Sequence, residues 1–306
     1  MSVKTQIVLA GGAMGFNWLP VYAALRKGMF EARGLEVELR RTGSVQKATE
    51  AVIAGEAQLA ITPPEGAIAN RVGGGNLRII AGNVNRLPLS LVAHPRFTRI
   101  EELKGAVLGT SSLTEGTAIY TQAMLAEHGL RYPADYSFDV VGVHPARWQA
   151  LKDGRIDAAV QLVPLNFVAF DEGWSNLGEV SDYIPEILFT GLICEQHWAK
   201  TNAEPVGGFL AALSEGTRFV LDPANDDFTI PVLMEVAQAD ETYARRSLDY
   251  MREKAVFRVD LAVLPTAYAK TIELMIATGL LPSDQAASAQ DTFNPAYLGS
   301  METAQC

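Results

Sequence analysis

The chain has 306 residues, of which 48% are hydrophobic and 20% are charged, and its formal net charge is −10. This composition is typical of a globular protein and excludes a disordered, collagen-like or coiled-coil chain. The acidic balance excludes binding to the phosphate backbone of nucleic acids, which requires basic patches. At roughly 150 residues per domain, the length predicts two domains.

Apolar runs, cysteines and histidines narrow the class further. No apolar stretch approaches the roughly 20 residues that a membrane helix needs, so we expect no transmembrane segment. The two cysteines, Cys194 and Cys306, are too few for a disulfide framework, and the four histidines show no metal-ligand spacing. We therefore expect neither a metal nor a cofactor. The start of the chain is too short for a signal peptide, which predicts either a cytoplasmic protein or one whose leader was replaced by a Met.

Strand and helix patterns alternate through the first third of the chain. Apolar residues at helical spacing are separated from short strand-like runs by glycine-rich loops. The strand patterns lie at 6–10, 35–39, 58–62 and 77–81. The helical patterns lie at 18–33, 45–54 and 63–72. This βαβαβαβ order predicts an open, mainly parallel sheet covered by helices.

The same order restarts after Pro95 and gives way to a helical region after Pro205. Strand patterns lie at 106–109, 137–143, 158–162 and 187–194, and helical ones at 100–104, 115–128, 145–153 and from 164. The C-terminal helices are predicted at 206–221, 227–237, 240–255 and 265–278. Two strand-like segments, 89–93 and 191–194, join the two α/β units. We expect these segments to pair with each other and to act as a hinge.

A ligand site is expected outside the carboxyl ends of the strands, where open α/β sheets bind their ligands. Here those ends carry small polar loops, whose backbone N–H groups at helix starts favour an anion or a polar oxygen. Helix capping by each Ser or Thr, and core packing of each aromatic residue, are the alternatives. Because the loops of both units face one crevice, we predict a site that comprises Phe16, Asn17, Trp18, Gly43, Ser44, Thr62, Pro63, Glu65, Ser111, Ser112, Glu115, Gly116, Thr117, His144, Gln161 and Pro164.

Catalytic motifs are weaker than this binding pattern. No G-x-G-x-x-G follows the first strand, and no G-x-S-x-G nucleophile elbow is present. Glu65 and Glu115 form a candidate acid/base pair across the crevice, with dipole-stabilised surface charges as the alternative. His144 and Arg147 are candidates to serve an anion, with a structural histidine and a solvent-facing arginine as the alternatives. The two glutamates suit an amine or a pyrimidine instead. We therefore assign no catalytic residue and leave the charge of the ligand open.

Four phrases carry a resemblance to a known family. Residues 17–30 (NWLPVYAALRKGMF) and 34–39 (GLEVEL) resemble the opening of the sulfonate/nitrate/taurine and thiamine-pyrimidine group of substrate-binding proteins. Three further phrases of that group are matched in order and spacing by residues 51–61 (AVIAGEAQLAI), 100–105 (IEELKG) and 150–159 (ALKDGRIDAA). The resemblance covers about residues 6–200.

This resemblance implies a type II periplasmic-binding-protein fold, with two α/β lobes, mainly parallel sheets, two crossing strands and a helical C-terminal region. Lobe 1 would be 1–92 plus 192–306, and lobe 2 would be 93–191. It also implies a substrate-binding protein that captures a small organic solute for an ABC permease, as a monomer or weak dimer. Its location would be periplasmic or otherwise extracytoplasmic if a leader is removed, and cytoplasmic if not.

Two other functions compete with solute capture. An enzyme on the same fold, of decarboxylase, dehydratase or lyase type, would act on a small organic acid or heterocycle. A ligand-sensing protein would use the same closure to signal. The fungal pyrimidine synthase of thiamine biosynthesis, which shares the fold, carries a cysteine-rich motif that is absent here, and this disfavours that activity. We expect a binding protein rather than an enzyme.

Overall fold

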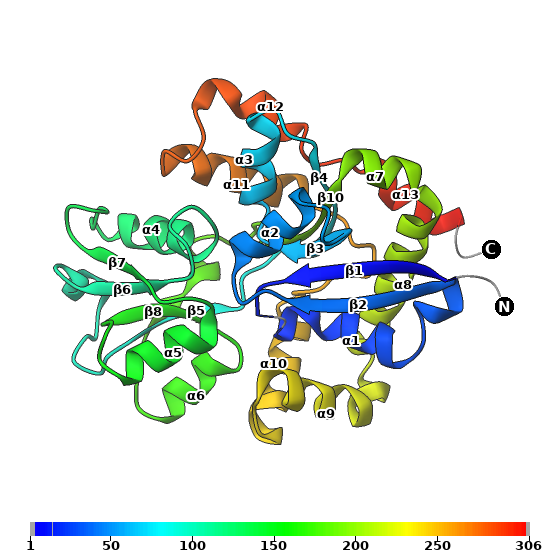
Figure 1. Cartoon of the computed structure of the whole chain (residues 1–306). Coiled ribbons are helices and arrows are strands. Elements are labelled where there is room, and N and C mark those ends of the chain that lie inside the picture. The colour runs from blue at the N-terminus through cyan, green and yellow to red at the C-terminus, as the bar shows by residue number, and fades with distance from the viewer. Residues whose placement is uncertain (1–3, 14, 304–306) are drawn as a thin grey trace.

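Two α/β units lie side by side in the computed structural model, which describes residues 4–13 and 15–303 (Figure 1). Met14 and Cys306 lie outside these residues. Each unit contains one five-stranded sheet. This arrangement is the mixed α/β architecture with a helical C-terminal region that the sequence predicts.

The first sheet has the strand order β2-β1-β3-β10-β4. Strand β1 is parallel to both β2 and β3, and β10 is antiparallel to β3 and β4. The parallel strands lead into helices, as the alternating pattern requires. The strands are β1 (Thr5–Gly11), β2 (Leu35–Arg41), β3 (Leu59–Thr62), β4 (Leu77–Val84) and β10 (Thr190–Glu195).

The second sheet repeats this arrangement, with the order β7-β6-β8-β5-β9. Strand β6 is parallel to β7 and β8, and β5 is antiparallel to β8 and β9. The short, polar β9 lacks an apolar run and was not predicted. The strands are β5 (Leu89–Ala93), β6 (Val107–Thr110), β7 (Ser137–Val140), β8 (Ala158–Leu162) and β9 (Ser175–Glu179).

The expected pairing between the two crossing segments is wrong. Strand β5 follows β4 in the chain but pairs within the second sheet, and β10 follows β9 but pairs within the first sheet. Each crossing strand thus leaves the unit of the strand that precedes it in the chain and forms an antiparallel strand in the sheet of the opposite unit. The first sheet takes its strands from 5–84 and 190–195, and the second from 89–179. The finer division into lobes 1–92 plus 192–306 and 93–191 stays a prediction.

Helices cover both sheets, and the C-terminal helices pack around the first unit (Figure 1). The long α8 lies along α1, and the ring of its Phe209 stacks on that of Phe30, in the segment after α1, with centroids 4.9 Å apart. The helices are α1 (Leu19–Arg26), α2 (Val45–Ile53), α3 (Glu65–Val72), α4 (Thr117–Glu127), α5 (His144–Lys152), α6 (Leu165–Asp171), α7 (Gln196–Thr201), α8 (Ala203–Leu221), α9 (Asp226–Ala237), α10 (Glu241–Glu253), α11 (Pro265–Ala277), α12 (Ala286–Gln290) and α13 (Ala296–Thr303).

The helix predicted at 18–33 is shorter than expected. It ends at Arg26, because Gly28 takes a φ of +69° and turns the chain. A separate 3-10 helix, Glu31–Arg33, follows and is capped by the left-handed Gly34. The four predicted C-terminal helices are confirmed, with ends within a few residues of α8, α9, α10 and α11.

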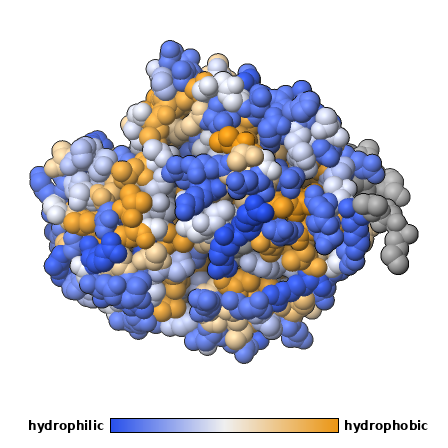
Figure 2. Space-filling view, viewed as in Figure 1, coloured by the Kyte–Doolittle hydropathy of each residue, from blue (hydrophilic) through white to orange (hydrophobic). Residues whose placement is uncertain are grey.

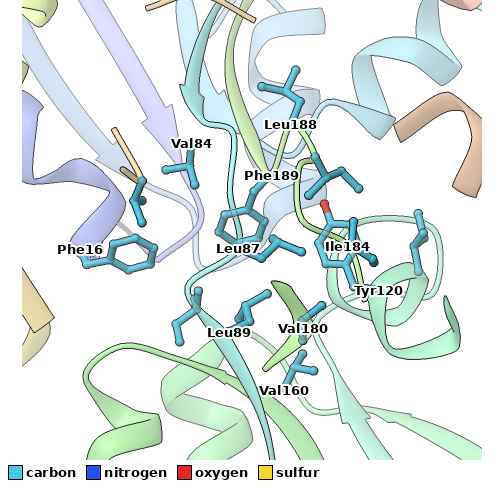
Figure 3. Packing of buried hydrophobic residues seen from close by; sticks show 14 of the residues in the cluster. Phe16, Val84, Leu87, Leu89, Tyr120, Val160, Val180, Ile184, Leu188 and Phe189 are labelled. Carbon is cyan, nitrogen blue, oxygen red and sulfur yellow. The ribbon is translucent and has the colours of Figure 1, made fainter. Parts of the chain in front are cut away.

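The apolar core continues from one unit into the other through the crossing segments (Figure 3). Leu87 and Phe189, which belong to the two crossing connections, pack between Phe16 of the first unit and Tyr120 of the second. The rings of Tyr120 and Phe189 meet edge-on, with centroids 6.2 Å apart. The floor between the units is therefore apolar and well packed.

The molecular surface is mainly hydrophilic on the face shown in Figure 2, where apolar residues form separate patches. Within residues 4–13 and 15–303, no helix is long and apolar enough to span a bilayer.

Candidate functional site

A cavity lies between the two units, at the carboxyl ends of their parallel strands, as expected for open α/β sheets. The space between its atoms amounts to about 570 Å³, a figure that includes space open to solvent. Both units contribute to its walls. The lining residues are Gly12, Ala13, Asn17, Trp18, Val45, Ile61, Thr62, Pro63, Ser111, Gly116, Thr117, Val143, His144, Arg147, Leu162, Phe189 and Thr190.

The wall from the first unit is built around Trp18. The missing side chain of Gly11 lets the Trp18 indole lie directly against the end of β1, since a Cβ there would overlap the ring. Asn83, at the end of β4, donates one hydrogen bond to the carbonyl of Asn17 (2.9 Å) and another to the hydroxyl of Thr190 (3.1 Å). The Asn83 amide thereby fixes the loop after β1 to the crossing strand at the cavity floor.

The wall from the second unit carries a cluster of hydroxyl groups at the start of α4. The Thr117 hydroxyl lies 2.9 Å from that of Thr110 and 3.3 Å from that of Ser111. Gly116 precedes the helix with a φ of +58°, a conformation that side chains rarely adopt. This loop brings the N-terminus of α4, with its partial positive charge, to the cavity.

Arg147 is the charged residue of the cavity lining, and it is 2% exposed. Its Nε donates to the carbonyl of Val160 (3.0 Å) and its Nη1 to the carbonyl of Gly142 (3.3 Å). Its Nη2 has no hydrogen-bond partner among the described residues, and none of their carboxylates pairs with it. Burial lowers the pKa of the guanidinium to about 9, which leaves it charged at neutral pH. The cavity thus contains a cation without a counter-ion.

His144 begins α5 beside this cation and touches the opposite unit. Its Nε2 lies 3.2 Å from the position that a Cβ on Gly15 would occupy, so the ring packs on first-unit backbone. Burial, and then the charges of Arg147 and Arg41, lowers the pKa of His144 to about 3. The ring is therefore neutral at physiological pH and offers one donor and one acceptor to a ligand.

The predicted site residues fall into two groups of eight. The eight that line the cavity are Asn17, Trp18, Thr62, Pro63, Ser111, Gly116, Thr117 and His144. The eight that lie outside its lining are Phe16, Gly43, Ser44, Glu65, Ser112, Glu115, Gln161 and Pro164. A role in ligand binding stays a prediction for both groups.

Several residues of the second group have structural contacts. Phe16 packs against Phe257 in the core, with ring centroids 6.5 Å apart. The Ser44 hydroxyl caps α2 by accepting a hydrogen bond from the N–H of Lys47 (3.4 Å). With its amide turned to satisfy both groups, Gln161 donates to the carbonyl of His144 (3.2 Å) and accepts from the N–H of Trp148 (3.1 Å). Phe16 and Ser44 thus have the contacts expected from core packing and helix capping, the alternatives weighed from sequence, whereas Gln161 links backbone groups of α5.

The remaining members of that group are loop and helix-start residues. Gly43 turns the chain after β2 with a φ of +72°. The Ser112 hydroxyl accepts a hydrogen bond from the N–H of Thr114 (3.1 Å), and Pro164 precedes α6. Glu65 and Glu115 are buried beside the cavity, at the contact between the units.

Several lining residues are absent from the predicted set. Phe189 lies in the crossing connection just before β10 and Thr190 is the first residue of β10, two places that the strand-end rule does not cover. Val45, Ile61, Val143 and Leu162 are apolar neighbours of predicted positions, and their patterns indicate core. Arg147 is a candidate anion ligand from the sequence but is not in the predicted set, because its burial is visible only in the structure.

The described residues contain neither a metal-ligand cluster nor a reactive thiol. Within residues 4–13 and 15–303, no group of three His, Cys, Asp or Glu side chains could hold a metal ion. Cys194 is a buried free thiol on β10, and burial raises its pKa to about 12. It is therefore inert as a nucleophile.

Comparison with known proteins gives both a family and a fold. Residues 15–225 match the family described as NMT1/THI5 like. The 4-amino-5-hydroxymethyl-2-methylpyrimidine phosphate synthase THI13 of Saccharomyces cerevisiae is 24% identical in an alignment 231 residues long that covers 68% of this chain. The matched region spans 66% of the yeast protein's length.

Solved structures match over the whole chain at low sequence identity. A protein of Bordetella bronchiseptica RB50 superposes with a TM-score of 0.83 at 20% identity, covering 100% of this chain and 99% of its own. The alkanesulfonate-binding protein SsuA from Xanthomonas axonopodis pv. citri, bound to MOPS, gives a TM-score of 0.78 at 14% identity, covering 96% of this chain and 100% of its own. These likenesses identify the fold as that of periplasmic binding proteins.

Proposed function

Since this chain belongs to the NMT1/THI5-like family, we propose that it is a substrate-binding protein that captures a small organic solute between its two units. Ligand contacts from both units would shift an open–closed equilibrium towards the closed form. The moving bodies are lobe 1, 1–92 plus 192–306, and lobe 2, 93–191. The closed form would deliver the solute to an ABC permease, and the protein would then act outside the cytoplasmic membrane.

The unpaired cation of the cavity carries this proposal. Arg147 is buried among lining residues that include no carboxylate, so an anionic ligand would supply the missing counter-ion. The hydroxyl groups of Ser111 and Thr117 and the N-terminus of α4 favour the same charge. Trp18 and Phe189 provide apolar surface for the rest of the molecule. We therefore propose a small organic anion with an apolar body, which favours the acid among the alternatives left open by the sequence.

A thermal-shift screen tests this function. Organic sulfonates, carboxylates, pyrimidines and primary amines are added separately at rising concentration, and the melting temperature is measured. An anion at 100 times its dissociation constant is expected to add about 2.7 kcal/mol to the free energy of unfolding. Amines are expected to give no shift, because the cavity lining offers them no carboxylate. Stabilisation by amines but not by anions would contradict the proposal.

A filled-cavity variant checks that the ligand lies between the units. Ser111→Leu places a large side chain in the lining and is expected to abolish the anion-induced shift without unfolding the protein. Leu113→Phe is the matched control, since it enlarges an exposed side chain of the same loop that does not line the cavity. An anion-induced shift that survives Ser111→Leu unchanged would place the ligand elsewhere.

An enzyme on the same fold is the second candidate, and the buried pair Glu65 and Glu115 favours it. Burial raises the pKa of Glu65 to about 8 and that of Glu115 to about 7, values suited to proton transfer at neutral pH. The yeast relative is also a synthase by name. Both carboxyl groups lie outside the cavity lining, which favours binding. Mass spectrometry of a stabilising compound after incubation separates the two: an unchanged compound supports binding, and conversion supports catalysis.

A further inference from the structure

Two buried carboxyl groups lie where the two units meet, beside the cavity and outside its lining. Glu65 begins α3 in the first unit and is 1% exposed. Glu115 lies just before α4 in the second unit and is 5% exposed. Neither carboxyl group is required for the capture of an anion at Arg147, since both lie outside the cavity lining. A buried carboxyl pair is costly to maintain unless it is protonated or paired with a cation.

Each carboxyl group reaches across to the opposite unit. The Oε1 of Glu65 accepts a hydrogen bond from the hydroxyl of Tyr120 on α4 (3.3 Å). The Oε1 of Glu115 fills the space that a side chain on Gly66 of α3 would occupy, and the Thr49 hydroxyl of α2 borders the same space. Both contacts exist only while the units are together, so separation of the units would expose both carboxyl groups to water.

No cation compensates the pair among the described residues. The titratable groups that face Glu65 are Glu115 and Tyr120, and the one that faces Glu115 is Glu50 on α2. The Oε2 atoms of Glu65 and Glu115 are buried without a hydrogen-bond partner among the described residues. Protonation removes the charge and turns one oxygen of each group into a donor.

We propose that Glu65 and Glu115 form a proton-binding latch, which takes up protons when the two units close and releases them when the units open. This inference rests on the lobe movement of the proposed function, but not on the identity of its ligand. No covalent step is involved, and water supplies and accepts the protons. The latch makes closure, and therefore ligand capture, more favourable at lower pH.

The direction of the pH dependence follows from linkage. Burial, followed by the charge of Glu115, raises the pKa of Glu65 to about 8 against opposing backbone hydrogen bonds. Burial, followed by the charge of Glu50, raises the pKa of Glu115 to about 7. An exposed glutamate has a pKa near 4.5. The closed form therefore holds more protons between pH 4.5 and about 8, and it loses stability relative to the open form as pH rises through that window.

Small-angle X-ray scattering on the full chain without ligand tests the latch. Radii of gyration are measured from pH 5.5 to 8.5 for the wild type and for the double variant Glu65→Gln/Glu115→Gln, whose amides cannot ionise. The closed-to-open ratio of the wild type is expected to fall at least about a hundredfold over this range, with a rise in radius. The double variant is expected to keep one radius from pH 6.5 to 8.5, where His144 is neutral and adds no pH dependence of its own.

A second measurement applies even if the double variant does not fold. Carboxyl carbons of glutamate are labelled with carbon-13, and the single variants Glu65→Gln and Glu115→Gln assign the two resonances. We expect these two resonances to titrate between about pH 6 and 9, above all other glutamates. Titration of both groups near pH 4.5 would overturn the latch, as would a wild-type radius that does not depend on pH or that follows the double variant.

Failure of the latch and failure of the proposed ligand are distinguishable. Both measurements are made without a ligand. A pH-dependent radius would therefore still support the latch if the ligand screen were negative. A positive screen with a pH-independent radius removes the latch and keeps the binding function. Gly66→Ala adds a steric check, because its methyl group displaces the Glu115 carboxyl and is expected to raise the radius at pH 5.5.

Discussion

Arg147 is the residue whose chemistry most constrains the ligand. A guanidinium without a counter-ion is expensive to bury, and two backbone carbonyls satisfy only part of its hydrogen-bonding capacity. An anion that reaches its free Nη2 removes that cost on binding. The affinity should therefore depend more on this group than on any hydroxyl in the lining.

Replacement of Arg147 by methionine tests this dependence. In Arg147→Met, anion affinity is expected to fall at least about a hundredfold, equivalent to roughly 3 kcal/mol. The free energy of unfolding without ligand should change little, since the variant loses two hydrogen bonds but no longer buries a charge. Titration calorimetry with an anion from the screen measures the effect. Arg155→Met is the control, because Arg155 pairs with Asp139 on the surface (3.1 Å). Equal affinities in both variants would exclude Arg147 as the anion ligand.

At the level of single residues, the sequence predicts the polar half of the cavity better than its apolar half. Thr62 ends β3, Ser111 follows β6 and Thr117 begins the helix after that loop, so the strand-end rule places all three at the cavity without any knowledge of packing. Phe189 and Val45 are apolar residues whose local patterns also fit the core. Only the three-dimensional packing shows which of their faces borders the cavity.

At the level of elements, local patterns predict where helices and strands lie but not which strands pair. The run at 89–93 and the run at 191–194 both read as strands, and both are strands. Their partners lie far away in the chain, β8 and β9 for one and β3 and β4 for the other. Nothing in a short apolar run specifies its neighbours, so the exchange of strands between the sheets could not be predicted.

Helix α8 offers a matched test of packing within one element. The missing side chain of Gly216 lets the backbone of Pro20 in α1 approach closely, with the Cβ of Ala24 3.0 Å from the Cβ position. Gly216→Ala forces this backbone contact apart and is expected to cost about 1–3 kcal/mol. Gly208→Ala meets only ordinary contacts at 3.6 and 3.7 Å, and should stabilise the helix by up to about 1 kcal/mol. Urea unfolding measures both, and equal effects would contradict the close approach of α1 and α8.

At the level of the whole molecule, the contact between the units contains ionisable groups whose protonation has opposite effects on the stability of the closed form. The carboxyl pair of Glu65 and Glu115 favours the closed form at low pH. His144 has the opposite effect, because its ring packs on Gly15 of the first unit and its pKa is lowered. The two contributions oppose each other between pH 4.5 and 6.5. The pH dependence of the wild type alone therefore cannot separate them, and a variant is required.

His144→Asn isolates the histidine contribution. The folded pKa of about 3 lies below the usual 6.5, so this group stabilises the protein fully above pH 6.5 and loses that effect as pH falls towards 3. Between pH 7 and pH 5, the free energy of unfolding of the wild type should fall by about 2 kcal/mol relative to the variant. Urea unfolding at both pH values gives this double difference, in which the carboxyl contributions cancel. The exposed His197 is replaced in the same way, His197→Asn, as the control for the substitution itself. Parallel pH dependence of the wild type and His144→Asn would mean that the His144 ring accepts a proton as easily in the folded chain as in the unfolded one.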